Sequence, residues 1–192
     1  MLDEFPELVG NGVDLQKEVL SHFGLLFSGY ALLEAAIQNF YIFYEQRRAV
    51  MAGELKNLQD WQSNHDKLER KAFSATLGGL ITLVSKCPEI SPGIGELKDL
   101  KKSRNYFAHH FFRAENDKLF SEAASLHLIF GMNELRHRVK MAENFVEVAS
   151  IDIIKEMYAG QNFEEMVADC MKEIESVAVR SPCMDFGWIS EE

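Results

Sequence analysis

The segment 19-VLSHFGLLFSGYALLEAAIQNFYIFY-44 decides the fold class of this chain. It belongs to one helical pattern that begins at Val13, ends near Met51 and is apolar on nearly every side. A helix of this kind is either the central buried helix of a bundle or a membrane span. Polar side chains recur along it, and a charge at the centre of a bilayer is costly. These side chains are His22, Ser28, Glu34, Gln38 and Asn39. We therefore expect a buried bundle helix and no membrane span.

Outward from this segment, the sequence predicts further helices. They span residues 54–86, 94–113, 120–149 and 163–179. Gly53 permits the first turn, and the segment 87-CPEISPGIG-95 is typical of a loop. We expect the second helix to enter the bundle around Phe73, where its composition changes from polar to apolar. No segment alternates with period two for long enough to be a strand. The sequence thus predicts an all-α, up-and-down bundle of four to five helices with short connections.

The length of 192 residues suits one well-packed domain with an appended tail. We expect residues 1–160 to form the bundle. Residues 161–192 are expected to form an acidic C-terminal helix and tail that packs on the bundle or extends from it. The formal net charge is −10, and the basic residues cluster between Lys98 and Lys140. Because affinity for phosphate comes from cations, any contact with nucleic acid must be local.

Cysteine usage and the first residues bear on the cellular compartment. Cys87, Cys170 and Cys183 are odd in number and include no CxxC pair, which predicts a reducing compartment without disulfides or a zinc site. The start, MLDEFPELVG, lacks a basic segment followed by an apolar one, so we expect a cytoplasmic protein.

The sequence has no P-loop, no H-E-x-x-H and no G-x-S-x-G motif. We therefore expect neither a cofactor nor a metal.

Arg104 is an anomaly within the predicted helix 94–113. A helical projection places it in the middle of an apolar stripe that includes Leu100, Phe107 and Phe111. A guanidinium removed from water is strongly unfavourable unless it is paired. The arginine stem could instead lie along the apolar surface and carry its charge to the edge. The sequence leaves both arrangements open.

Glu34 is the matching anomaly in the first helix, because it is the only charged side chain between Val19 and Tyr44. Taken with Arg104, it predicts a buried or half-buried ion pair that joins the first and third helices. Such a pair could be purely structural and fix the register of the two helices. Desolvated charges are nevertheless enriched at functional sites, so this position is also a candidate site.

Asn105 and His109 lie four residues apart and share one face of the third helix, next to Arg104. Lys98 and Lys102 flank this face and make it cationic. A histidine can exchange a proton with a 2′-hydroxyl or its leaving oxygen, and an arginine can bind phosphate oxygens and stabilise the charge that develops during attack. If the helix bends near its end, Arg104 and His109 could converge on one anionic group. This chemistry would be metal-independent RNA cleavage.

At these residues the sequence resembles the HEPN superfamily. The signature of that superfamily is an arginine, often followed by asparagine, and a histidine after four to six intervening residues. Here it consists of Arg104, Asn105 and His109, with Tyr106, Phe107 and Ala108 completing the motif. The motif lies late in the third predicted helix, after a leucine-spaced lead-in that starts at Leu97. The preceding segment 76-TLGGLITLV-84 is similar to the helix before RN-x-x-A-H in some bacterial members.

The resemblance covers roughly residues 20–145 and implies a helical bundle that forms a homodimer, with two motifs facing each other in a cleft. Many members are endoribonucleases of toxin–antitoxin or phage-defence systems. They are often neutralised by an antitoxin partner, commonly a small nucleotidyltransferase. By position, Arg104 and His109 would be catalytic, Asn105 would orient them and Glu34 would hold Arg104. Other members bind a partner protein or a nucleotide without cleaving RNA, and this alternative stays open.

Further cations complete the candidate site. We expect His110, which points to another face of the helix, to support the site structurally. The candidate RNA-binding residues are Lys98, Lys101, Lys102, Arg136 and Arg138. The last two belong to the segment 136-RHRVK-140, which is either a solvated face or the wall of an RNA cleft. His127 and His137 lack neighbouring carboxylates at ligand spacing, so we expect no metal there.

Overall fold

The computed structural model describes residues 12–158 and Lys172. The chain divides into two compact units, residues 1–154 and residues 155–192. The described residues form helices and turns, with no β-strand among them. The predicted all-α class is therefore confirmed. The helix predicted over residues 163–179 and the tail after it lie outside the described residues, with the exception of Lys172.

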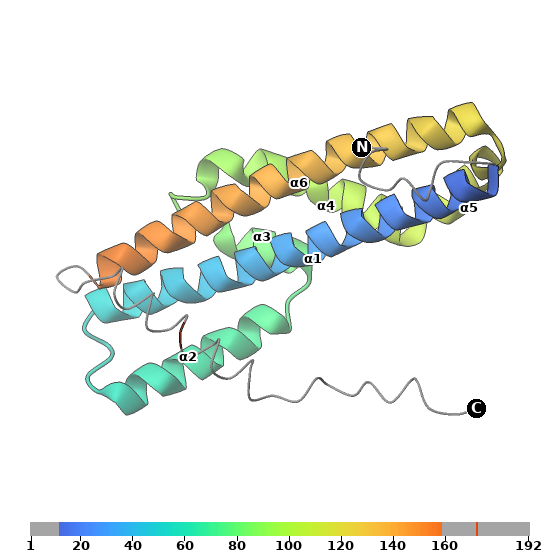
Figure 1. Cartoon of the computed structure of the whole chain (residues 1–192). Coiled ribbons are helices and arrows are strands. Elements are labelled where there is room, and N and C mark those ends of the chain that lie inside the picture. Colours follow the sequence, from blue (N-terminus) through green and yellow to red (C-terminus); the bar gives the residue numbers. More distant parts are fainter. Residues whose placement is uncertain (1–11, 159–171, 173–192) are drawn as a thin grey trace, which may run out of the picture. The chain divides into compact units, whose positions relative to one another are not determined.

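Six α-helices and two short 3-10 turns make up the bundle in the described part of the chain (Figure 1). The α-helices are α1 (Gly12–Met51), α2 (Leu58–Phe73), α3 (Leu77–Val84), α4 (Ile94–His109), α5 (Phe111–Glu115) and α6 (Glu122–Met157). The 3-10 turns are η3 (Ser91–Gly93) and η4 (Asn116–Phe120). Figure 1 shows α1 and α6 running in the same direction, while α4 runs the opposite way beside them. This arrangement brings the candidate motif on α4 against α1.

α1 is the central helix, as predicted, and it contacts α2, α3 and α4. Its Leu33, Ile37 and Phe40 side chains are fully buried. α3 and α4, which contact α1, add buried leucines to the core, including Leu80 and Leu100. Of the helices in the described residues, α1 is the one whose length and apolar composition would suffice to cross a membrane, a criterion that core helices of soluble proteins also meet.

The connection from α1 to α2 depends on Gly53 and on a buried glutamine. Gly53 has a φ of 68°, a left-handed conformation that glycine adopts without steric cost. Gln46 is buried at the end of α1, where its Nε2 donates to the Trp61 carbonyl. The Asn64 Nδ2 donates to Gln46 Oε1 at 2.7 Å. These hydrogen bonds satisfy the buried amide and hold α2 against α1.

The predicted second helix is in fact two helices, α2 and α3. The chain leaves the helical path after Phe73, and Thr76 caps α3 by accepting a hydrogen bond from the Gly79 N–H at 3.2 Å. Phe73 itself is 57% exposed, but its neighbour Ala72 is fully buried, so the chain does enter the core around this position. From Leu77 onward the apolar residues of α3 are buried as well, after the cap has redirected the chain.

The third predicted helix also ends early. α4 begins at Ile94, as expected, but stops at His109 rather than continuing to Arg113. A separate short helix, α5, follows it and leads through η4 into α6. The interruption comes directly after the candidate motif and therefore shapes the site.

Candidate functional site

The candidate site lies where α4 stops. His110 leaves the helical conformation, with φ −126° and ψ −27°, while its N–H still donates to the Tyr106 carbonyl at 2.8 Å. The next residue, Phe111, starts α5. The chain therefore does change direction near the end of the helix that carries the motif. It leaves His109 as the last residue of α4.

An aromatic cluster fixes this bend against α1. Phe111 is 2% exposed, and its ring centroid lies 4.9 Å from Phe107 and 5.4 Å from Phe23. The ring centroid of Phe112 also lies close to that of Phe23, at 4.8 Å. Because these rings come from α1, α4 and α5, they hold the helix end in one position relative to the bundle.

Arg104 occupies the edge of the apolar stripe. Its side chain is half-buried, and its guanidinium carbon lies 5.9 Å from the centroid of the Phe27 ring. Phe27 is itself 39% exposed, so the charge sits over the face of an aromatic ring at the surface of the bundle. The second of the two arrangements left open by the sequence is therefore the one observed.

The predicted ion pair between Glu34 and Arg104 is wrong for this structure. The ion pairs among the described residues do not include one between these two side chains. The reason is their position along the helix axis: Phe27, which Arg104 contacts, precedes Glu34 by two turns, or about 10 Å. Glu34 is half-buried and does not hold Arg104.

The motif residues remain accessible but are not assembled into one catalytic pair. Asn105, His109 and His110 are exposed. His109 lies five positions after Arg104, which turns their side chains about 140° apart around α4. The described residues show no contact between them. The His109 and His110 rings lie 6.3 Å apart, edge to face.

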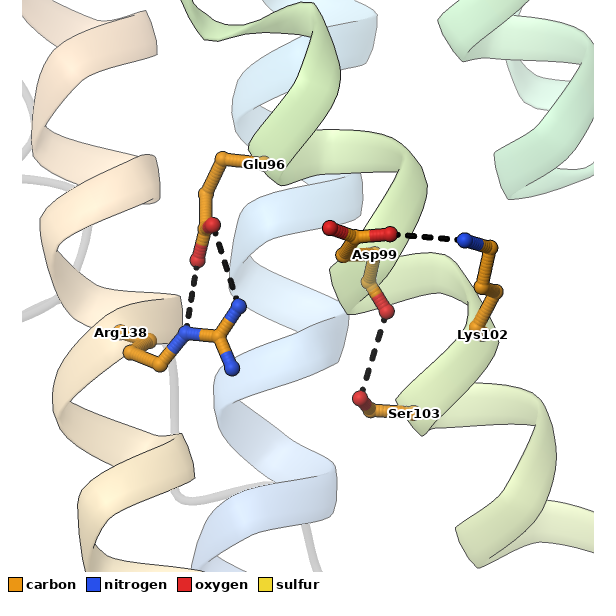
Figure 2. A network of polar contacts seen from close by, with 5 residues as sticks. All are labelled: Glu96, Asp99, Lys102, Ser103 and Arg138. Atoms are coloured by element: carbon orange, nitrogen blue, oxygen red, sulfur yellow. Dashed lines mark hydrogen bonds and ion pairs between the residues drawn. The ribbon is translucent and has the colours of Figure 1, made fainter.

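Two of the predicted RNA-binding cations are paired with carboxylates (Figure 2). Arg138 forms a bidentate pair with Glu96, at 2.9 and 3.1 Å, which links α6 to α4. Lys102 pairs with Asp99 one turn earlier, at 2.8 Å. These pairs are exposed and could open at small cost. They nevertheless make the predicted cationic strip closer to neutral than the sequence suggested.

The other three predicted cations lie in different surroundings. Lys98 is exposed on α4. Lys101 extends over Gly78 of α3, where an added Cβ would lie 2.8 Å from its Nζ. Arg136 is half-buried and faces a groove between α1 and α6 rather than the motif. The five cations therefore do not form one continuous surface.

The groove between α1 and α6 has a volume of about 650 Å³. Leu25 and Leu32 of α1 contribute exposed apolar side chains to it. α6 contributes Arg136, His137 and Lys140, the last of which pairs with the buried Glu143 at 3.1 Å. Its combination of apolar walls and cations is suited to an anionic partner or ligand.

A buried pair of titratable groups, Glu18 and His22, was not predicted. Both residues are 4% exposed, and His22 Nε2 lies 3.8 Å from Glu18 Oε1. Burial lowers the pKa of His22 below its usual value, Glu18 opposes this shift and Arg136 adds to it. The i, i+4 spacing of two polar residues in an apolar helix was the sequence signal for this pair.

The His22 pKa predicts how stability depends on pH. As the pH falls through about 6.5, the unfolded chain takes up a proton before the folded chain does, so stability present above that pH is lost below it. We expect chemical denaturation to show a smaller loss between about pH 7.5 and 5.5 in His22→Gln than in the wild type. The exposed His137→Gln variant should keep the wild-type slope. Identical slopes in wild type and His22→Gln would contradict the burial of a neutral His22.

No group of three or more potential metal-ligating side chains occurs among the described residues. Comparison with known proteins adds no assignment: the chain matches no protein-family model, no curated protein and no solved structure.

Proposed function

We propose that this chain is a HEPN-like, metal-independent endoribonuclease in which Arg104 and His109 act on the RNA phosphodiester. The observation that carries this proposal is the end of α4. His109 is exposed at the bend, and Arg104 holds its charge at the surface over Phe27. Neither is among the residues that form ion pairs in the described part of the chain, whereas nearby Lys102 and Arg138 are neutralised. The side chains of Arg104 and His109 therefore remain available to a phosphodiester.

The proposed reaction needs a base, an acid and a stabiliser of negative charge. The imidazole of His109 takes the proton of the 2′-hydroxyl as the 2′-oxygen bonds to phosphorus. The bond from phosphorus to the 5′-oxygen breaks, and the leaving 5′-oxygen receives a proton. Arg104 donates hydrogen bonds to the non-bridging oxygens as their charge grows. The products are a 2′,3′-cyclic phosphate and a 5′-hydroxyl.

A homodimer would complete this site. In-line attack places the nucleophile and the leaving group on opposite sides of phosphorus, so one imidazole cannot serve both. A second copy of the chain would supply the other imidazole. Exposed apolar side chains along α1, including Leu20 at 50% and Leu32 at 56%, support such an association. We further propose a cytoplasmic toxin or phage-defence role, with an antitoxin or nucleotidyltransferase as the neutralising partner.

The proposal is tested by incubating the purified chain with labelled single-stranded RNA in the presence of EDTA. We expect shortened fragments to accumulate with time, because neither the base nor the charge stabiliser is a metal. RNA that stays intact over a range of sequences and salt concentrations would overturn the proposal.

The α1–α6 groove favours a second candidate function. In this alternative the chain binds a partner protein or a nucleotide without cleaving RNA, and the apolar and cationic walls of the groove receive it. Charge reversal by Arg136→Glu should then abolish partner binding. Under the endoribonuclease proposal, the same substitution should leave RNA cleavage in place.

A further inference from the structure

A pocket of about 280 Å³ lies directly beside the motif, between α4, α5, η4 and α6. It is separate from the α1–α6 groove. Its walls carry both aromatic rings and titratable groups, contributed by Tyr106, Phe107, Glu115, Lys118, His127 and Gly131. Two of these residues, Tyr106 and Phe107, stand inside the motif between Arg104 and His109. The helix turn that presents the motif therefore also builds the pocket.

Ring–ring contacts fix the position of the aromatic side chains that line the pocket. The Tyr106 and Phe107 rings lie 5.6 Å apart, at 89° to each other. Phe107 stacks on the buried Phe111, which also lines the pocket. Single-stranded RNA is recognised by splayed bases that stack on such rings and form hydrogen bonds through their edges.

The polar wall centres on Glu115. The Tyr106 hydroxyl donates to Glu115 Oε1 at 2.6 Å, and Lys118 pairs with the other carboxylate oxygen. Lys118 and Tyr106 lower the pKa of Glu115, and the hydrogen bond to Glu115 raises the pKa of Tyr106 to about 12. Glu115 is therefore an ionised acceptor at neutral pH. Oε2 is buried beside Lys118, so Oε1, which already accepts from Tyr106, is the oxygen left to accept a donor from a ligand.

The pocket also lies close to His109, the residue proposed to transfer the proton. Tyr106 precedes His109 by three residues, and side chains at this spacing are neighbours on a helix surface. The ring of His110 lies 6.5 Å from that of Tyr106. A group held in the pocket would thus lie next to the imidazole of the motif rather than on another side of the bundle.

We propose that this pocket binds the nucleobase next to the scissile phosphate and prefers guanine, an inference that rests on the proposed function. The volume of 280 Å³ is below the range of about 300–1,000 Å³ typical of larger ligands and suits a single base. Guanine presents two adjacent N–H donors on its Watson–Crick edge, and both can point at Glu115 Oε1, the oxygen left to accept them. Uracil has one N–H donor between two carbonyls, which the carboxylate would repel.

Binding of guanosine 5′-monophosphate, compared with the other three nucleoside monophosphates in an NMR titration, tests this inference. Gly131 provides the blocking variant, because a Cβ added there meets nothing within 4 Å while the residue lines the pocket. We expect Gly131→Leu to weaken guanosine monophosphate binding by about tenfold or more. Gly24→Leu, at another open glycine of a helix that does not line the pocket, is the matched control and should bind like the wild type.

Glu115→Gln tests the guanine preference with little change of shape. We expect it to reduce binding of guanosine monophosphate to the level of uridine monophosphate. Equal binding of all four nucleotides by the wild type, or unchanged binding by Gly131→Leu, would overturn the inference. If the chain cleaves RNA but binds all four nucleotides equally, the proposed guanine site is wrong and the proposed endoribonuclease activity stands. If the wild type binds guanosine monophosphate, Gly131→Leu does not, and no RNA is cleaved, the proposed endoribonuclease activity is wrong and the proposed guanine site stands.

Discussion

His109→Ala is expected to slow RNA cleavage by at least about 100-fold, because it removes the group that transfers the proton. Arg104→Ala should have an effect of similar size through the loss of charge stabilisation at the phosphate. Both side chains lie at the surface of α4, so the fold should persist in either variant. The measurement is the initial rate of fragment formation in EDTA, with circular dichroism to confirm helicity.

A histidine far from the motif provides the control. His65 on α2 stacks on Trp61 and takes no part in the proposed site. His65→Ala should cleave RNA at the wild-type rate. Equal rates for His109→Ala and wild type would remove His109 from the mechanism, even if the chain is a nuclease.

The second large effect concerns stability. Phe111→Ala should lower the free energy of unfolding by about 3–5 kcal/mol, because it leaves a cavity where the rings of α1, α4 and α5 meet. Urea denaturation measures this change. Phe120, which is 76% exposed, offers a matched control, and Phe120→Ala should shift the free energy of unfolding by no more than about 0.5 kcal/mol. A loss below about 1 kcal/mol for Phe111→Ala would contradict the tight packing of the bend.

The helical class and the central position of α1 could be predicted because a 40-residue helix that is apolar on nearly every side is typical of a buried helix. The helix breaks after Phe73 and at His110 were harder to predict. Neither break contains glycine or proline, and the apolar pattern continues past both. At His110 the break is stabilised by aromatic rings from three helices. This stabilisation comes from tertiary packing, which the local sequence does not predict.

The contacts around the motif could be predicted only in part. Periodicity identifies the face on which Arg104 lies, but it gives no position along the partner helix, so the pairing with Glu34 was wrong and the contact with Phe27 was missed. The pair of Lys102 and Asp99 could have been found from its i, i+3 spacing. The pair of Arg138 and Glu96 could not, because 42 residues separate its members and only the packing of α6 on α4 brings them together.

The most direct test of the central claim is the chemical nature of the RNA ends that the wild-type chain produces in EDTA. Attack by the 2′-hydroxyl predicts fragments that end in a 2′,3′-cyclic phosphate and begin with a 5′-hydroxyl, which mass spectrometry distinguishes from the alternatives. Intact RNA, or fragments that appear only with a divalent metal and carry a 5′-phosphate, would contradict the role proposed for Arg104 and His109.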